Sequence, residues 1–350
     1  MNSVKSLLAR QEFGLFIVII ALTLAFGFFN PHFLTSQNAG FVLQSVAVIG
    51  IMAVGQVFVL IGGEIDLSVG SVLGFTGAVG AWLMSQGVNA WLAVALTVLC
   101  GCLVGLVQGL VVVVGKVSSF IVTLGMLSIA RGLTEIVTGG LPIQLSPEVL
   151  VIGQGSVWGY LTWSAVIFVG LAIIGQFILS RSVFGSRVTA IGDNMEAARL
   201  GGIPVKRTRA MLFVITGAMS AIAGIVYATQ SGYAEGNAGM GDELFVIAAV
   251  VIGGASLAGG RGSVVGALLG AILLGALQNA FVLLHLSPFL QQLSIGVVIV
   301  LAALVDQLRQ GNFAAPGWIR RSRRRRSDEA GEPPSPRGEG ETTTLEKEHV

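Results

Sequence analysis

Charged residues are nearly missing from the first half of this chain, and this scarcity limits what the chain can fold into more than any other feature. Between positions 13 and 180, the charged residues are Glu64, Asp66, Lys116, Arg131, Glu135 and Glu148. Over all 350 residues, 11% are charged and the mean hydropathy is +0.85, whereas soluble domains carry about 25% charged residues. A surface that faces water cannot be built from so few charges, so we expect the surrounding solvent to be lipid.

Apolar runs long enough to cross a bilayer recur along the chain. A helix crosses the hydrocarbon core with about 20 apolar residues. On this basis we predict an all-α polytopic membrane protein with about ten transmembrane helices, near residues 13–29, 41–61, 68–85, 91–114, 118–137, 161–179, 211–229, 243–258, 262–283 and 289–307. The first run ends without a small-residue cleavage site, so we interpret it as a membrane helix rather than a signal peptide.

The distribution of Lys and Arg predicts how these helices are oriented. Short cytoplasmic loops of membrane proteins are enriched in both residues. With the N-terminus inside, every Lys and Arg except Arg131 falls in a predicted inner segment, and the predicted outer loops at 30–40, 86–90, 138–160, 230–242 and 284–288 contain none. We therefore expect both termini inside, a cytoplasmic N-terminus over residues 1–12, a transmembrane domain over 13–307 with a large inner loop at 180–210, and a cytoplasmic tail over 308–350.

The predicted tail differs in composition from the rest of the chain. An arginine-rich run at 320–326 is followed by an acidic stretch with Pro and Gly that continues to Val350. Such a composition is typical of disorder, and arginines that follow a membrane helix can contact anionic lipid headgroups. We favour this interpretation over nucleic-acid binding because the run directly follows the last predicted helix.

No residue pattern typical of an enzyme or a metal site occurs in the sequence. The three histidines are scattered and form no metal-binding spacing. Residues 109–118 differ from a phosphate-binding loop, because five residues separate the glycines and Val117 follows Lys116. We expect no catalytic residue, no metal ligand and no ATP bound by this chain itself.

A polar stretch interrupts the apolar sequence between the second and third predicted helices. Residues 62–71 read Gly-Gly-Glu-Ile-Asp-Leu-Ser-Val-Gly-Ser. Asp66 and Ser68 could cap the helix that follows. The stretch is either a short cytoplasmic turn or a break at membrane depth, which is tolerated only where it lines a cavity or is buried in protein.

Arg131 and Glu135 lie four residues apart in the fifth predicted helix, so they share a helix face. This spacing predicts an intramembrane ion pair. Charges inside a membrane often mark functional sites, but a purely structural pair near the outer interface is the other interpretation.

The inner loop contains a segment with helix signals at both ends. Asp193 could be the N-cap and Glu196, three residues later, could complete a capping box. Gly201 or Gly202 could end the helix. A short helix held in the cytoplasm between two membrane helices would suit docking to a soluble partner, while the alternative is an ordinary charged loop.

Three blocks of the sequence are spread over most of residues 40–305. They are Gly63–Gly74, with the pattern Gly-x-Ile-Asp-Leu-Ser-Val-Gly-Ser, then Phe120–Gly125 with Arg131-Gly132, and residues 192–203 followed by 248–266 with its Gly-Gly-Ala-Ser-Leu-x-Gly-Gly-x-Gly run. Together these blocks resemble the ribose-type ABC transporter permeases of bacterial inner membranes. Glu196-Ala197-Ala198-x-x-x-Gly202 also resembles the start of the EAA motif of ABC permeases, although the distal Ile-x-Leu-Pro of the longer motif is absent.

The resemblance implies a homodimer of permeases in the bacterial inner membrane. The dimer would sit on a two-domain cytoplasmic ATPase, which would bind ATP and Mg²⁺, and would receive a ribose-, xylose- or galactose-like monosaccharide from a periplasmic binding protein. By analogy, the helix that couples the permease to the ATPase comprises Asp193, Asn194, Glu196, Ala197, Ala198, Arg199 and Gly202. Our candidates near the translocation pathway are Asp66, Ser68, Thr123, Gln278 and Asn279.

Two other functions remain open at this point. The first is a secondary transporter driven by an ion gradient, for which the carboxylates of Glu64, Asp66 or Glu135 would have to carry the ion. The second is an ABC permease for branched-chain amino acids. A membrane-embedded enzyme is disfavoured because the sequence lacks a clustered nucleophile, acid pair or metal site.

Overall fold

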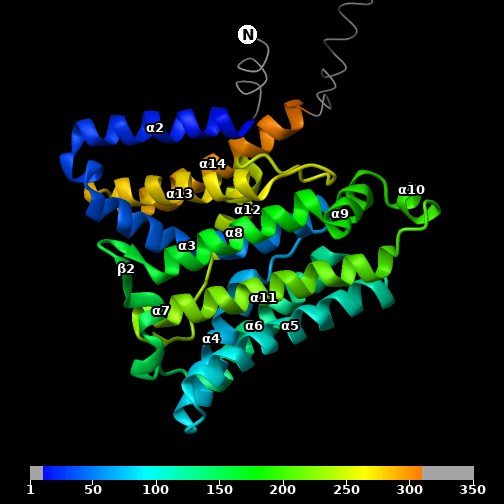
Figure 1. Cartoon of the computed structure of the whole chain (residues 1–350), viewed down its shortest axis with the longest axis horizontal. Coiled ribbons are helices and arrows are strands. Elements are labelled where there is room, and N and C mark those ends of the chain that lie inside the picture. Colours follow the sequence, from blue (N-terminus) through cyan, green and yellow to red (C-terminus); the bar gives the residue numbers. More distant parts are fainter. Residues whose placement is uncertain (1–10, 310–350) are drawn as a thin grey trace, which may run out of the picture. The chain divides into compact units, whose positions relative to one another are not determined.

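The computed structural model of the chain describes residues 11–309, and the part up to Asp306 forms one compact unit. The expected inner N-terminus up to residue 10 and the expected tail from residue 310 lie outside the described residues. The long helices run side by side, with α9 and α10 at one end of the bundle and β2 and α7 at the other (Figure 1).

Seven helices in the described part are long and apolar enough to cross a membrane: α2 (Gln11–Phe29), α3 (Ser36–Ile61), α5 (Ala90–Val114), α6 (Ser119–Thr138), α8 (Trp163–Arg181), α11 (Val205–Ser231) and α13 (Val264–Leu283). The chain is therefore a polytopic membrane protein. Three further helices coincide with the remaining predicted positions: α4 (Val69–Ser85), α12 (Asp242–Ile252) and α14 (Pro288–Arg309). The predicted count of ten crossing helices is not confirmed, because α12 has 11 residues and is only about 17 Å long, against about 30 Å of hydrocarbon.

Short elements connect the long helices. They are the helices α7 (Val151–Gln154), α9 (Val183–Asp193) and α10 (Met195–Leu200), the 3-10 helices η1 (Pro31–Leu34) and η2 (Pro147–Val149), and the strands β1 (Ile143–Gln144), β2 (Ser156–Trp158), β3 (Leu161–Thr162) and β4 (Tyr233–Ala234). β1 pairs antiparallel with β4, and β2 with β3. The first pair joins two connections that we predicted to be on the outer side.

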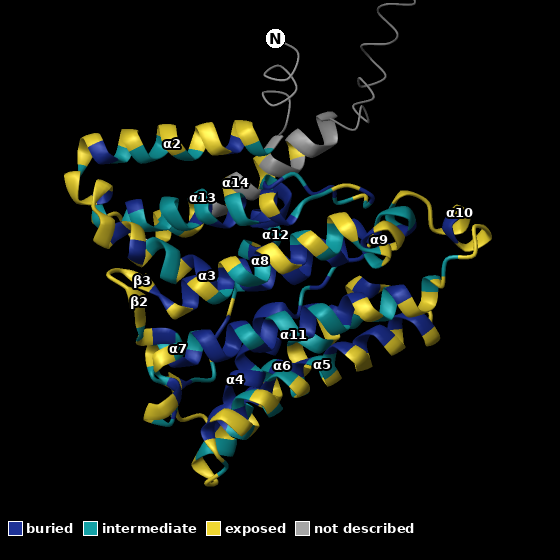
Figure 2. Ribbon diagram, in the orientation of Figure 1, coloured by how far each residue is buried: buried dark blue, intermediate teal, exposed yellow. Residues whose placement is uncertain are grey.

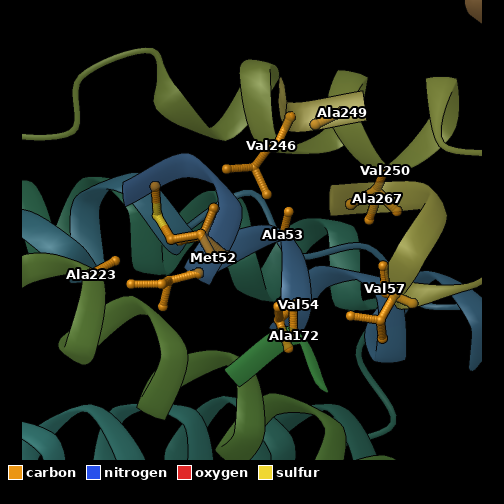
Figure 3. Close-up of a cluster of buried hydrophobic side chains, with 14 of the residues drawn as sticks. Met52, Ala53, Val54, Val57, Ala172, Ala223, Val246, Ala249, Val250 and Ala267 are labelled. Carbon is orange, nitrogen blue, oxygen red and sulfur yellow. The ribbon is translucent and has the colours of Figure 1, made fainter. Parts of the chain in front are cut away.

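The core is built around α3. Small and β-branched side chains of α3, such as Ala53 and Val57, meet Ala172 of α8, Val246 of α12 and Ala267 of α13 (Figure 3). α3 is almost wholly buried along its inner two thirds, whereas α2 and the outer faces of α5 and α6 carry many exposed side chains (Figure 2). Exposed apolar side chains on spanning helices are suited to lipid or to another membrane subunit.

Glycines allow α5 and α11 to approach closely. A Cβ atom on Gly101 would lie 2.3 Å from the carbonyl oxygen of Gly217, and one on Gly105 would lie 2.1 Å from that of Phe213. Both distances are far below van der Waals contact, so only glycine fits. Close backbone approach at small residues is typical of helix packing in membranes.

Candidate functional site

The polar side chains of the stretch after α3 are buried, which identifies it as a break inside the protein rather than an exposed turn. Asp66 and Ser68 are 1% and 0% exposed. The carboxylate of Asp66 accepts hydrogen bonds from the backbone N–H and the hydroxyl of Ser68, at 2.8 and 2.7 Å. Ser68 in turn accepts a 2.6 Å hydrogen bond from the Gln108 side chain. Gln108 lies six residues before the end of α5, so α4 begins about 9 Å inside that end.

Ser68 is the N-cap residue of α4, but its side chain makes no capping bond. Asp66 binds Ser68 instead of the first turn of the helix. The two residues therefore bond to each other within the break, and the capping role that we expected for them is wrong.

The same break is attached to α6 and α11. The Thr123 hydroxyl donates to the carbonyl of Ile65 at 3.3 Å, and the Ile65 N–H donates to the Ser119 hydroxyl at 3.4 Å. Arg209 of α11 forms an ion pair with Glu64, which is 5% exposed. Three of the predicted pathway residues, Asp66, Ser68 and Thr123, thus lie around one segment, residues 62–68, which we call the inner break.

The other two predicted pathway residues lie elsewhere. Gln278 and Asn279 are near the C-terminal end of α13, and Asn279 accepts a 2.9 Å hydrogen bond from Asn38 at the start of α3. Asn279 therefore connects two helices far from the inner break.

Arg131 does not pair with Glu135 in the described part of the chain, so the predicted ion pair is wrong. The Arg131 guanidinium donates to the backbone carbonyls of Gly236 and Ala238, at 3.1 and 2.8 Å. Glu135 instead lines a pocket of ≈ 240 Å³ together with Glu235 and Asn237. The helix spacing allows the pair, but a loop more than 100 residues away supplies better-placed acceptors for the guanidinium.

The loop that Arg131 binds reaches deep into the bundle. A Cβ atom on Gly70 would lie 2.3 Å from the carbonyl oxygen of Gly239. Gly70 is 15 residues from the C-terminal end of α4, about 22 Å along the helix axis. Residues 235–241, which we call the outer re-entrant loop, therefore meet the start of α4. The segment 230–242, predicted as an outer loop, thus extends into the bundle, and this path explains why α12 starts at depth and is short.

The inner loop does contain the predicted short helix, α10, but its start is different. Asn194, not Asp193, is the N-cap residue, and its side chain accepts a 2.9 Å hydrogen bond from Ala197 N–H. Glu196 forms an ion pair with Arg199 at 2.5 Å instead of completing a capping box, and this bond lowers the pKa of Glu196. The helix ends at Gly201, and Gly202 follows with a positive φ of 79°.

α10 presents a mostly exposed surface. Ala198 is its buried residue, while Glu196, Ala197 and Arg199 are exposed and Leu200 is 78% exposed. A six-residue helix is too short to be stable alone in water. Its cap, its ion pair and its attachment to α9 hold it in place, with polar and apolar groups available to a partner.

Comparisons with known proteins agree with this architecture. A family profile described as branched-chain amino acid transport system / permease component matches residues 38–303. The chain is similar to the L-arabinose ABC transporter permease protein AraH of Azospirillum brasilense, with 39% identity over 86% of this chain and 89% of the relative. It is also similar to the ribose import permease protein RbsC of Escherichia coli K12, with 37% identity over 84% and 93%, and to that of Bacillus subtilis, with 36% over 85% and 93%.

The comparison with solved structures found no match. The family profile nevertheless covers the inner break, the outer re-entrant loop, α10 and the helices around them. The chain therefore belongs to the family of membrane proteins that is described as branched-chain amino acid transport system / permease component.

Proposed function

We propose that this chain is the membrane permease subunit of an ATP-binding-cassette importer for a monosaccharide of the ribose or arabinose class. The observation that carries the substrate class is the 36–39% identity, over 84–86% of the chain, to permeases named for ribose and L-arabinose. The chain performs no chemistry of its own, and ATP with Mg²⁺ is bound by a separate ATPase.

The partners follow from the same proposal. Two copies of the chain form the permease in the bacterial inner membrane with both termini inside. A two-domain ATPase docks on α10 from the cytoplasm, and a periplasmic binding protein delivers the sugar from outside. The coupling residues are Asp193, Asn194, Glu196, Ala197, Ala198, Arg199 and Gly202.

The exposed position of α10 supports a coupling role. α10 projects from the end of the bundle at which α9 also lies (Figure 1), and its exposed surface combines the Glu196–Arg199 pair with Leu200. Such a mixed surface is suited to a protein partner, because covering an exposed apolar side chain with a partner removes it from water and favours binding. ATP binding to the ATPase would then shift α10 and tilt the membrane helices between outward- and inward-facing states.

The inner break is our candidate part of the pathway in each subunit. Asp66, Ser68 and Thr123 remain pathway candidates, because polar groups at membrane depth are costly and often mark functional sites. Gln278 and Asn279, near the end of α13 that we predict to face outside, are our candidates for the outer entrance of the pathway.

Two alternatives are tested directly by uptake into proteoliposomes. The vesicles contain the permease, its ATPase and its binding protein, and are offered labelled ribose, arabinose, xylose, galactose and, separately, leucine, isoleucine and valine. We expect ATP-dependent uptake of one pentose or hexose. Uptake of a branched-chain amino acid but of no sugar would show that the substrate is an amino acid. Uptake that is independent of ATP and abolished by an uncoupler would indicate a secondary transporter.

A further inference from the structure

A second break lies between α12 and α13, at residues 253–263, and it touches the first. The N–H of Gly260 donates a 2.9 Å hydrogen bond to the carbonyl of Ile61, the last residue of α3. The two breaks are thus joined backbone to backbone, although about 200 residues separate them in sequence.

The end of α9 packs against the two residues that form this hydrogen bond. A Cβ atom on Gly192 would lie 1.7 Å from the Ile61 carbonyl oxygen and 2.5 Å from the Gly260 nitrogen. Neither atom belongs to a flexible side chain, so no residue other than glycine fits at position 192 without moving a backbone segment.

The neighbouring glycines are also tightly packed. A Cβ atom on Gly259 would lie 2.9 Å from the Gly192 carbonyl oxygen and 3.1 Å from the Gly63 Cα, and one on Gly260 would lie 2.0 Å from the Asp193 carboxylate. Gly63, Gly259 and Gly260 all have positive φ, at 76°, 92° and 75°. Three segments far apart in sequence therefore meet through glycines, and we call this contact the inner joint: Ile61–Gly63, Gly192-Asp193 and Gly259-Gly260.

The inner joint connects α10 with the inner break, whose first two residues it includes. On one side, Asn194 caps α10 directly after Asp193. On the other side, Gly63 leads into Glu64 and Asp66, which are tied to Arg209 and Ser68. The contacts of Gly192 with Ile61 and Gly260 are backbone to backbone, so a displacement there cannot be absorbed by changing rotamers, and movement at one side reaches the other.

We propose that Gly192 is a positioning residue for transport, and that the inner joint passes the movement of α10 to both breaks at once. This inference rests on the proposed function, because it requires that a partner moves α10. Added volume at Gly192 separates α9 from the breaks while leaving the exposed residues of α10 unchanged.

The decisive variant is Gly192→Ala in the complete complex, with Gly170→Ala as its matched control. A Cβ atom on Gly170, on α8, would have no atom within 4 Å. We expect Gly192→Ala to retain the ATPase and to hydrolyse ATP at a rate within twofold of the wild type, while the amount of sugar transported per ATP falls at least tenfold. Gly170→Ala should leave that ratio unchanged, and an unchanged ratio in Gly192→Ala would overturn the proposal.

A second measurement applies even if Gly192→Ala fails to assemble. Hydrogen exchange is followed in the wild-type complex with and without a non-hydrolysable ATP analogue. When the analogue binds, we expect exchange at residues 62–66 and 256–262 to change together with exchange at 195–200. A change confined to 195–200 would overturn the proposal that the inner joint transmits movement. The proposed function itself fails by a different result, namely the absence of ATP-driven uptake in the wild type.

Discussion

At the scale of single residues, Arg131 shows what spacing along a helix can and cannot predict. Arg131 and Glu135 share a face of α6, as the i, i+4 spacing requires. The guanidinium nevertheless binds Gly236 and Ala238 of the outer re-entrant loop, because the two N–H groups of its Nη1 nitrogen can donate to both carbonyls. The sequence contains no local signal for acceptors that come from a distant loop.

Replacing Arg131 by Met should destabilise the protein whether or not Glu135 is also replaced. The change removes two charge-assisted hydrogen bonds and leaves carbonyls of Gly236 and Ala238 without donors, at a cost of about 2 kcal/mol or more. Adding Glu135→Leu should not restore stability. The free energy of unfolding, measured by SDS titration in mixed micelles, checks both variants.

The coupling energy between the two positions is the informative number. We expect it to be below about 0.5 kcal/mol in a double-mutant cycle. Recovery of most of the lost stability in the double variant would mean that Arg131 and Glu135 form an ion pair after all.

At the scale of elements, the apolar runs predicted where helices lie along the chain, but not how deep each one begins. Hydropathy predicted a helix near 243–258, and α12 occupies 242–252. The approach of Gly239 to Gly70 places the start of α12 inside the bundle. This depends on a contact between distant segments, which no window of sequence contains. The same limit applies to the inner break, whose burial depends on α5, α6 and α11.

The ion pair between Arg209 and Glu64 fixes the inner break to α11. Arg209→Met should cost about 3–5 kcal/mol, because it leaves a buried carboxylate without a partner. The double change Arg209→Met with Glu64→Met should recover most of that loss. Arg207→Met, at an exposed position on the same helix, is the control and should change stability by no more than about 0.5 kcal/mol. Equal losses in the single and double variants would contradict the importance of this ion pair.

The contact between α5 and α11 gives a second test at this scale. Gly105→Ala forces a methyl group against the Phe213 carbonyl, and we expect a loss of about 1–3 kcal/mol from overpacking. Gly125→Ala, on α6, meets no atom within 4 Å and should stabilise the helix by up to about 1 kcal/mol. Thermal inactivation of the purified protein ranks the two, and a harmless Gly105→Ala would show that the helices can separate at little cost.

At the scale of the whole molecule, the central feature is the continuous connection from α10 through the inner joint to the inner break. The sequence predicted α10 from its flanking glycines and its polar residues, yet it assigned the cap to Asp193 rather than Asn194. Both residues suit an N-cap chemically. The choice is made by α9, which extends to Asp193 and places that carboxylate against Gly260.

Changes on α10 should uncouple transport from ATP hydrolysis without preventing membrane insertion. Glu196→Lys breaks the pair with Arg199 and reverses the charge on the proposed docking surface, and Gly202→Val places a branched residue at a φ of 79°. We expect each to lower ATP-driven uptake at least tenfold, whereas Glu196→Gln, which keeps the shape of the side chain, should have a smaller effect. Uptake at the wild-type rate in both variants would remove α10 from the coupling mechanism.

The most direct measurement compares solute accumulation by the purified chain alone with accumulation by the chain reconstituted with its ATPase and binding protein. If α10 connects an ATPase to the membrane helices, only the complete complex will concentrate labelled sugar, and only with ATP in the compartment that faces α10. Accumulation of sugar against a gradient by the chain alone would contradict this mechanism.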